Sequence, residues 1–225
     1  MAIKIITDST CDIDISRQEE LGIEIVPLSI KFGDKEYIDG VTLTKSEFYK
    51  LLAQCDELPT TAQVNPKRFE KIFSDYINNG DEVIGLFISS KLSGTFQSAI
   101  IAKNLVGSEK IHLVDSKTVT FPLGLLVLEA AKMRDQGMSA LEIIEKLEDL
   151  KTRLRFYAVL DTLKYLKMGG RLSPTSAFFG SVLQIKPIVS IVDGEVIAVD
   201  KKKGLRAASQ SIGKKVEEEK PDTSH

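Results

Sequence analysis

Residues 82–99, EVIGLFISSKLSGTFQSA, are expected to contain a strand, a short loop and the start of a helix, which is the repeating unit of an α/β fold. Residues 82–88 form an apolar run typical of a buried strand. Ser93 is expected to cap the following helix, and Gly94 permits a close approach to the backbone. The free amides of the first helical turn favour an anion there, and the spacing does not decide between a carboxylate and a phosphate.

The same alternation of strands and helices extends over the first two thirds of the chain. The expected strands are residues 3–6, 23–30, 35–38, 82–88 and 111–114. The expected helices begin at Thr44, at Asn65-Pro66 and at Ser93, and two more cover residues 118–136 and 139–150. Strands that alternate with helices imply right-handed crossovers and a parallel sheet. We therefore expect an α/β fold whose N-terminal domain, residues 1–152, has three layers with a parallel sheet in the middle.

The remaining residues, 153–225, are expected to form a second α/β domain with a mixed sheet. Asp193-Gly194, between two β-rich runs, is a strong signal for a hairpin turn. The expected strands are residues 156–161, 187–192 and 195–199. The expected helices are residues 162–167, a stretch after Ser173-Pro174, and residues 205–217, followed by an acidic tail that should fray.

Hydroxyl side chains follow three of the expected parallel strands. The segments are Asp8-Ser9-Thr10, Ser89-Ser90 and Asp115-Ser116. Ligands of open parallel sheets bind beyond the carboxyl ends of the strands, so these hydroxyls gather on the rim where a ligand is expected. Each segment taken alone could simply cap a helix or close a turn.

Composition and missing motifs exclude several classes of protein. The 225 residues carry 30 basic and 32 acidic side chains, a net charge of -2, which argues against nucleic acid as the main partner. The only histidines are His112, inside an expected strand, and the terminal His225, so neither a Ser-His-Asp triad nor a zinc site is supported. Cys11 is a possible nucleophile without an identified base. We expect a non-catalytic protein without metal or cofactor.

The expected location is the cytoplasm. The chain begins directly with a strand-like run and has no signal-peptide pattern. Its longest apolar stretch, residues 119–131, is interrupted by Pro122 and Glu129 and is too short to span a bilayer. We therefore expect no transmembrane segment.

Six segments in this order resemble the DegV family. They are Thr7-Asp8-Ser9-Thr10, Pro59-Thr60-Thr61-Ala62-Gln63, Ser89-Ser90-Lys91-Leu92-Ser93-Gly94-Thr95, Asp115-Ser116, Gly169-Gly170-Arg171 and Lys186-Pro187-Ile188. The resemblance covers nearly the whole chain. It implies a two-domain protein that binds a long-chain fatty acid such as palmitate in a buried pocket between its domains. It also implies a partner, a fatty acid kinase, which phosphorylates the presented carboxylate for phospholipid synthesis.

The resemblance also assigns roles to individual residues. Thr61 and Ser93 are similar to the family's carboxylate ligands, Gly94 and Thr95 share the helix start, and Ser9 and Ser116 lie on the same rim. Arg171 is similar to an arginine that contacts the head group or the partner; from the residues alone it could equally be a structural bridge. The chain departs from the family at Ala62, where a serine is usual. Family members usually continue well past residue 225, so the second domain is expected to be truncated here or completed by another chain.

Two other hypotheses remain open at this stage. The clustered hydroxyls also fit an enzyme that acts on a small phosphate or acyl substrate at the same rim, with turnover that depends on Ser93 or Cys11. A third hypothesis is a regulatory module whose partner requires Arg171 and is indifferent to lipid.

Overall fold

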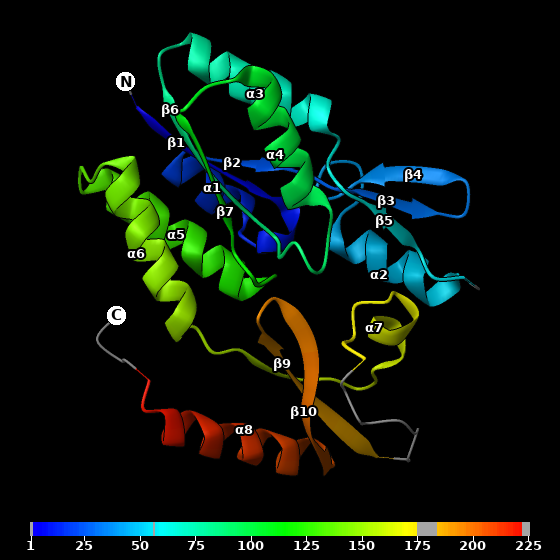
Figure 1. The fold of residues 1–225 in the computed structure, drawn as a ribbon. Coiled ribbons are helices and arrows are strands. Elements are labelled where there is room, and N and C mark those ends of the chain that lie inside the picture. Colours follow the sequence, from blue (N-terminus) through cyan, green and yellow to red (C-terminus); the bar gives the residue numbers. More distant parts are fainter. Residues whose placement is uncertain (1, 56, 175–183, 222–225) are drawn as a thin grey trace. The chain divides into compact units, whose positions relative to one another are not determined.

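The computed structural model describes residues 2–55, 57–174 and 184–221 (Figure 1). The chain divides into two compact units, Met1–Leu154 and Arg155–His225, and this division lies close to the boundary expected after residue 152. Within the described ranges, none of the helices is long and apolar enough to cross a bilayer.

The first unit is built on a parallel sheet of four strands in the order β2-β1-β6-β7. These strands are β1 (Ile3–Asp8), β2 (Ile23–Val26), β6 (Glu82–Phe87) and β7 (Ile111–Asp115). All three neighbouring pairs are parallel, as predicted. The carboxyl ends of the four strands therefore meet at one edge, which is where the sequence placed the hydroxyl segments.

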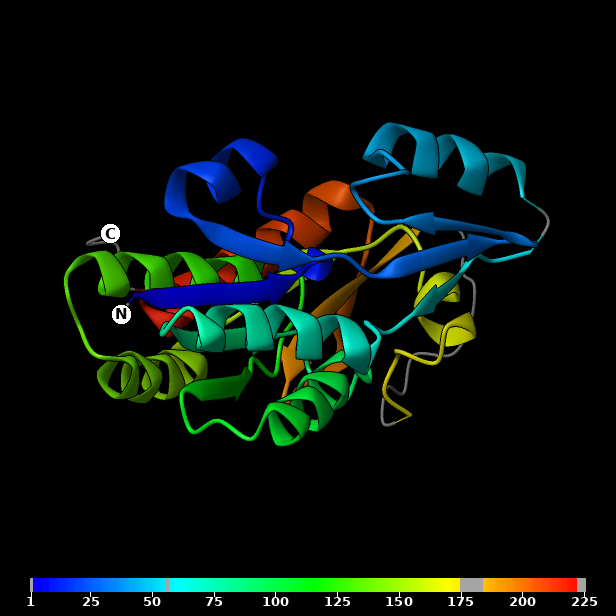
Figure 2. The ribbon, with the colours of Figure 1, turned by 90° about the horizontal axis from the view of Figure 1, so that it is seen from above.

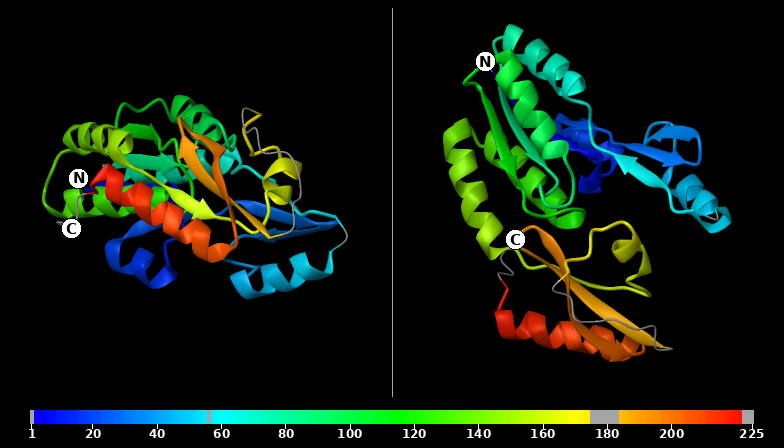
Figure 3. Two further views of the ribbon diagram at one scale, coloured as in Figure 1. Left: turned by 90° about the horizontal axis from the view of Figure 1, so that it is seen from below. Right: turned by 45° about the vertical axis from the view of Figure 1, so that its right-hand side comes forward.

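Helices cover both faces of this sheet (Figure 1). Their bounds are α1 (Ile15–Leu21), α3 (Pro66–Asn78), α4 (Thr95–Val106), α5 (Phe121–Asp135) and α6 (Ala140–Arg153). Helices α3 and α4 pack together on one face, and α5 and α6 pack together on the other (Figure 3). The three-layer arrangement predicted from the alternation is thus confirmed.

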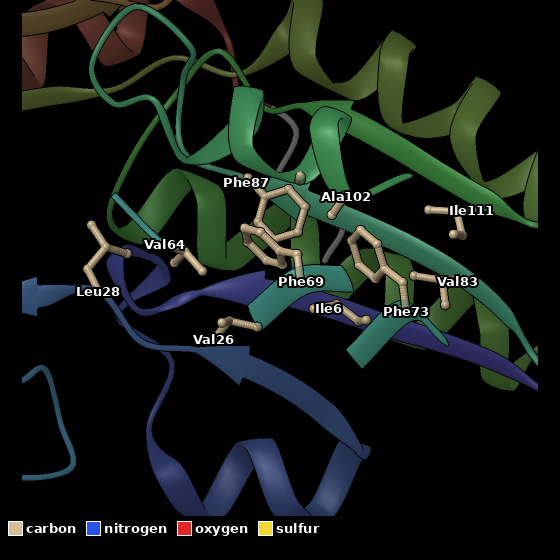
Figure 4. Close-up of a cluster of buried hydrophobic side chains, with 11 residues drawn as sticks. Ile6, Val26, Leu28, Val64, Phe69, Phe73, Val83, Phe87, Ala102 and Ile111 are labelled. Carbon is tan, nitrogen blue, oxygen red and sulfur yellow. The ribbon is translucent and has the colours of Figure 1, made fainter. Parts of the chain in front are cut away.

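The core beneath α3 and α4 is centred on three phenylalanines (Figure 4). Phe69 and Phe73 of α3 stack with ring centroids 5.6 Å apart, and Phe69 meets Phe87 of β6 edge-on at 4.9 Å. All three rings are fully buried. Burying side chains of this size stabilises the fold by about 2–3 kcal/mol each, which anchors β6 to the helix layer just before its loop begins.

A second, smaller sheet extends from the end of β2 (Figure 2). It has the order β4-β3-β5 and is antiparallel. Its strands are β3 (Ser29–Phe32), β4 (Lys35–Ile38) and β5 (Thr60–Ala62), and α2 (Lys45–Gln54) lies between β4 and β5 in the chain. Helix α2 begins with the predicted capping box, in which Thr44 and Glu47 exchange hydrogen bonds.

In the first unit, one predicted strand is divided in two, and three short elements were not predicted. The expected single strand 23–30 is two strands, with the break at Pro27, which has no amide to donate to a sheet. Strand β5 was not predicted, because its residues are polar and exposed and do not alternate. The short 3-10 helix Ser9–Cys11 and helix α1 were also missed, since neither has a long apolar period.

The second unit has an antiparallel sheet in the order β10-β9-β8. Its elements are β8 (Tyr157–Val159), α7 (Lys164–Met168), β9 (Ile185–Val192), β10 (Glu195–Lys203) and α8 (Leu205–Glu219). Helix α8 packs on the sheet (Figure 3). Where a mixed sheet was expected, the ladders are antiparallel, and the described residues add one parallel bridge, Leu172 to Val196.

The predicted hairpin turn is confirmed. Asp193 and Gly194 both have positive φ, +48° and +85°, the geometry that a two-residue turn between twisted strands requires. The helix expected after Ser173-Pro174 falls mostly on residues outside the described ranges.

Candidate functional site

The rim of the parallel sheet is organised around the buried carboxylate of Asp8, the last residue of β1. One oxygen accepts from the amide of Ile88 at 2.8 Å, and the other accepts from the amide and hydroxyl of Thr10 at 2.9 and 2.5 Å. Asp8 is fully buried. Burial raises the pKa of this carboxyl, and the hydrogen bonds from Thr10 and Ile88 lower it by less. Asp8 therefore ties the end of β1 to the loop that follows β6.

The same loop is held from the other side by the end of β7. The carboxylate of Asp115 accepts from the hydroxyl of Ser90 at 2.6 Å and from its amide at 3.3 Å. The amide of Ser89 donates to the carbonyl of Thr118 at 2.8 Å. The loop between β6 and α4 is thus fixed between its two neighbouring strands.

Helix α4 begins at Thr95, and its N-cap residue is Gly94 rather than the predicted Ser93. The hydroxyl of Ser93 nevertheless accepts from the amide of Thr95 at 3.2 Å, the kind of bond that a capping side chain makes. It also lies 3.0 Å from the hydroxyl of Thr95, which is fully buried. Ser93 is only half-buried, so it is the more accessible of the two hydroxyls at the helix start. The first amides of an α-helix lack carbonyl partners within the helix and favour an anion.

The residues that follow β5 contact the start of α4. The amide of Val64 donates to the hydroxyl of Thr95 at 3.4 Å, and Nε2 of Gln63 donates to the hydroxyl of Ser98 at 3.0 Å. These bonds join the segment after Thr61 to the first two turns of α4. The chain just after Thr61 is therefore attached to the start of α4, and the grouping of Thr61 itself with Ser93, Gly94 and Thr95 stays a prediction.

The register of the small sheet fixes the direction of the Thr61 side chain. Thr61 is paired with Ile30, and Thr60 is paired with Lys31. Directly opposed residues of an antiparallel pair project to the same face, and successive residues alternate. Thr61 therefore shares a face with the buried Ile30, and Thr60 shares the opposite face with the exposed Lys31.

A cavity of about 970 Å³ lies on the Ile30 side, within the first unit. Its apolar lining includes Ile25, Pro27, Ile30 and Phe48. The polar lining residues include Ser9, Asp12, Asp14, Asp39 and Lys45. The volume is in the range of about 300–1,000 Å³ that is common for small-molecule pockets. The lining thus combines an apolar wall with three carboxylates and one lysine.

The hydroxyls of Ser9 and Ser116, both named as site residues, also have hydrogen bonds inside the protein. Ser116 is 2% exposed; its hydroxyl donates to the carbonyl of Thr118 and accepts from the amide of Thr118, both at 3.2 Å. The hydroxyl of Ser9 accepts from the amide of Leu28 at 3.2 Å. Ser116 thus closes a turn, and Ser9 holds the connection between β2 and β3 while also lining the cavity.

Arg171 lies in the second unit, on the turn that follows α7. It is exposed, and its guanidinium donates to the carbonyl of Gly169 at 2.5 Å. Gly170 has φ +70°, so the predicted tight turn is confirmed. A role of Arg171 toward a ligand or a partner stays a prediction.

Cys11 and His112 are the two side chains that the sequence analysis considered for catalysis, and neither is an activated group at the open rim. Burial raises the pKa of the Cys11 thiol to about 11, so little thiolate forms near neutral pH. His112 is near the amino end of β7, where its Nε2 lies 2.7 Å from Oε1 of Glu82, at the edge of the sheet opposite the rim. In the ranges that the structure describes, no group of three or more His, Cys, Asp or Glu side chains is arranged to hold a metal ion.

Sequence reasoning missed two residues of this site. The role of Asp8 depends on Ile88, which is 80 residues away in the chain, and the role of Gln63 depends on Ser98, 35 residues away. The only signal in the sequence was their position in polar segments next to predicted strand or helix ends.

Comparisons with known proteins agree on one family. The family model described as "Uncharacterised protein, DegV family COG1307" matches residues 2–225. A DegV domain-containing protein of Caldanaerobacter subterraneus subsp. tengcongensis is 42% identical over 210 residues, covering 93% of this chain and 75% of that protein. One of Deinococcus radiodurans is 34% identical over 216 residues, covering 96% of this chain and 76% of that protein.

Solved structures of fatty-acid-binding proteins have the same fold. A fatty-acid-binding DegV family protein from Thermus thermophilus has a TM-score of 0.90 and 31% identity, covering 97% of this chain and 78% of that chain. DegV from Bacillus subtilis, a fatty acid binding protein, has a TM-score of 0.86 and 31% identity, covering 97% and 78%. A stearic acid-binding protein from Eubacterium ventriosum has a TM-score of 0.88 and 29% identity, covering 97% and 76%.

Proposed function

Because this chain belongs to the DegV family, we propose that it binds one long-chain fatty acid and does no covalent chemistry itself. The observation that carries the proposal is the course of β5 and the residues after it, from the cavity-lining Ile30 to the start of α4. Thr61 pairs with Ile30, which lines the cavity, and the segment after Thr61 is bonded to the start of α4. Relatives of the same fold are fatty-acid-binding proteins, which supports the ligand class.

The carboxylate is held at the start of α4. The hydroxyls of Thr61 and Ser93 donate to it, and the first amides of the helix with the helix dipole add electrostatic stabilisation. Together these contacts contribute about 1–3 kcal/mol. The network of backbone and hydroxyl groups that keeps this rim in place includes Ser9, Gly94, Thr95 and Ser116.

The hydrocarbon chain supplies most of the affinity. Burying each methylene group is worth about 0.8 kcal/mol, so about 14 of them give on the order of 11 kcal/mol before the cost of ordering the ligand. The chain runs along the Ile30 side, because the carboxylate is repelled from the acidic side chains of Asp12, Asp14 and Asp39 in the cavity lining. We also propose that the bound hydrocarbon chain is buried in a pocket between the domains, as the resemblance implies.

The bound carboxylate is presented to a fatty acid kinase in the cytoplasm, with Arg171 as a contact to the head group or to that partner. The protein itself is not the enzyme: the high pKa of Cys11 and the position of His112 at the opposite sheet edge support a binding role. A partner that phosphorylates bound palmitate only in the presence of this protein would support the presentation step.

The test compares palmitate binding by the wild-type chain, Thr61→Val and Thr60→Val. Both residues are exposed on β5, but they project to opposite faces of the sheet. Removing a hydrogen bond to a charged ligand should weaken binding by Thr61→Val about tenfold or more, whereas Thr60→Val should bind like the wild type. Native mass spectrometry before and after denaturation should also show acyl chains that leave the protein on unfolding.

Two results would overturn the proposal. One is the absence of acyl chains in the purified protein together with no uptake of added palmitate. The other is binding of a phosphate ester without binding of any acyl chain, which would favour an enzyme that acts on a small phosphate substrate at the same rim.

A further inference from the structure

We propose that Gln63 is a positioning residue of the head-group site, and that its uncharged amide is what lets this site accept an anionic ligand. The inference rests on the proposed function for the identity of the ligand. It is carried by the contact between the Gln63 carboxamide and the first turns of α4, a contact that involves neither of the two proposed ligand hydroxyls.

The carboxamide of Gln63 lies directly against Gly94. A Cβ atom added to Gly94 would be 1.7 Å from Oε1 of Gln63, 2.7 Å from its Cδ and 3.2 Å from its Nε2. Nε2 in turn donates to the hydroxyl of Ser98, which is fully buried in the second turn of the helix. Gly94 has φ -73°, an ordinary value for any residue. Its lack of a side chain is therefore needed for the space that Gln63 occupies, and its backbone angle does not require glycine.

This contact connects the two segments that carry the proposed ligands. Gln63 follows Thr61 by two positions, and the next residue, Val64, bonds the hydroxyl of Thr95. Thr95 is in turn 3.0 Å from the hydroxyl of Ser93. Displacing Gln63 would loosen the link between the strand of Thr61 and the helix start of Ser93.

The charge of residue 63 matters as much as its shape. The start of α4 attracts anions because its amides and dipole are positive. A carboxylate at position 63 would occupy the place of the amide, satisfy that potential and repel the carboxylate of a fatty acid. Glutamine fills the same space without a charge, which leaves the positive potential available to the ligand.

The experiment measures the dissociation constants of palmitate and of hexadecanol for the full chain. Gln63→Glu keeps the length of the side chain and adds one negative charge. We expect it to weaken palmitate binding about tenfold or more and to change hexadecanol binding by less than about twofold, because the alcohol carries no charge. Gln136→Glu, on an exposed residue at the end of α5, makes the same change in net charge elsewhere and should leave both constants unchanged.

A second arm tests the contact itself and needs no ligand. Gly94→Ala pushes the flexible carboxamide of Gln63 away, so its effect on the unfolding temperature should resemble that of Gln63→Ala. The double variant should be no less stable than either single variant, because both changes break one and the same contact.

The outcomes separate the two proposals. Additive effects of Gly94→Ala and Gln63→Ala on the unfolding temperature would overturn the proposed contact, whatever the ligand is. Equal weakening of palmitate and hexadecanol by Gln63→Glu would overturn its role in accepting an anion and leave fatty acid binding standing. If the wild-type chain binds neither compound, the proposed function fails, and the positioning role for an anionic lipid fails with it, while the double variant still reports on the contact.

Discussion

Replacing Asp8 by alanine should destabilise the first unit by about 3 kcal/mol. The amide of Ile88 would lose its acceptor at 2.8 Å in a buried position, which costs about 1–3 kcal/mol. The 3-10 helix after β1 would lose the side-chain cap that Asp8 provides at the amide of Thr10, which costs about 1 kcal/mol. Removing the buried carboxylate also removes its desolvation penalty, because burial disfavours the charged form, and this offsets part of the destabilisation.

The stability difference between the wild type and Asp8→Ala should also depend on pH, which gives a second, independent test. Burial raises the pKa of Asp8 above its ordinary value of 3.8. Between that value and the raised pKa the native state binds more protons than the unfolded state, so the contribution of Asp8 to stability falls as the pH rises through this window. The wild type should therefore gain stability relative to Asp8→Ala as the pH is lowered from neutral toward 4.

The assay is urea unfolding of both proteins by circular dichroism at several pH values. Asp115→Ala is the matched control, since Asp115 holds the same loop through Ser90 but its hydrogen bonds are exposed; its cost should stay below about 1 kcal/mol. The reasoning is refuted if Asp8→Ala and Asp115→Ala cost the same, or if the gap between wild type and Asp8→Ala widens as the pH rises.

Three further outcomes can be checked. Thr7→Val should raise the free energy of unfolding by up to about 1 kcal/mol, because the buried Thr7 hydroxyl has no partner among the described residues; a loss of that size in urea unfolding would contradict this. Phe87→Ala should cost about 3–5 kcal/mol in the same assay, because the ring is fully buried against Phe69; a cost below about 1 kcal/mol would argue against this packing. Cys11 should resist iodoacetamide at pH 8 in the folded protein, because its pKa is raised to about 11, and the half-buried Cys55 should react first; peptide mass spectrometry showing Cys11 modified first would contradict the buried environment.

The sequence predicted those parts of the fold that are specified by neighbours in the chain. The capping box of Thr44 and Glu47 and the turn at Asp193-Gly194 involve residues at most three positions apart. The buried strand β6 is an almost continuous apolar run, the usual pattern of a parallel sheet. Strand β5 could not be predicted in this way, because its three exposed residues are a strand only through their pairing with β3.

In the candidate site, too, some features are specified by neighbours in the chain and others by distant contacts. The sequence by itself predicted that a helix starts next to Ser93, since a serine, a glycine and a following helix are a local pattern, and a site for an anion there stays a prediction. Only the tertiary structure decided that the carboxylate of Asp8 is buried against the amide of Ile88. It also decided that the amide of Gln63 lies against Gly94. These contacts depend on how segments many residues apart are packed, and the burial that sets the pKa of Asp8 is a property of the packed fold rather than of any local stretch.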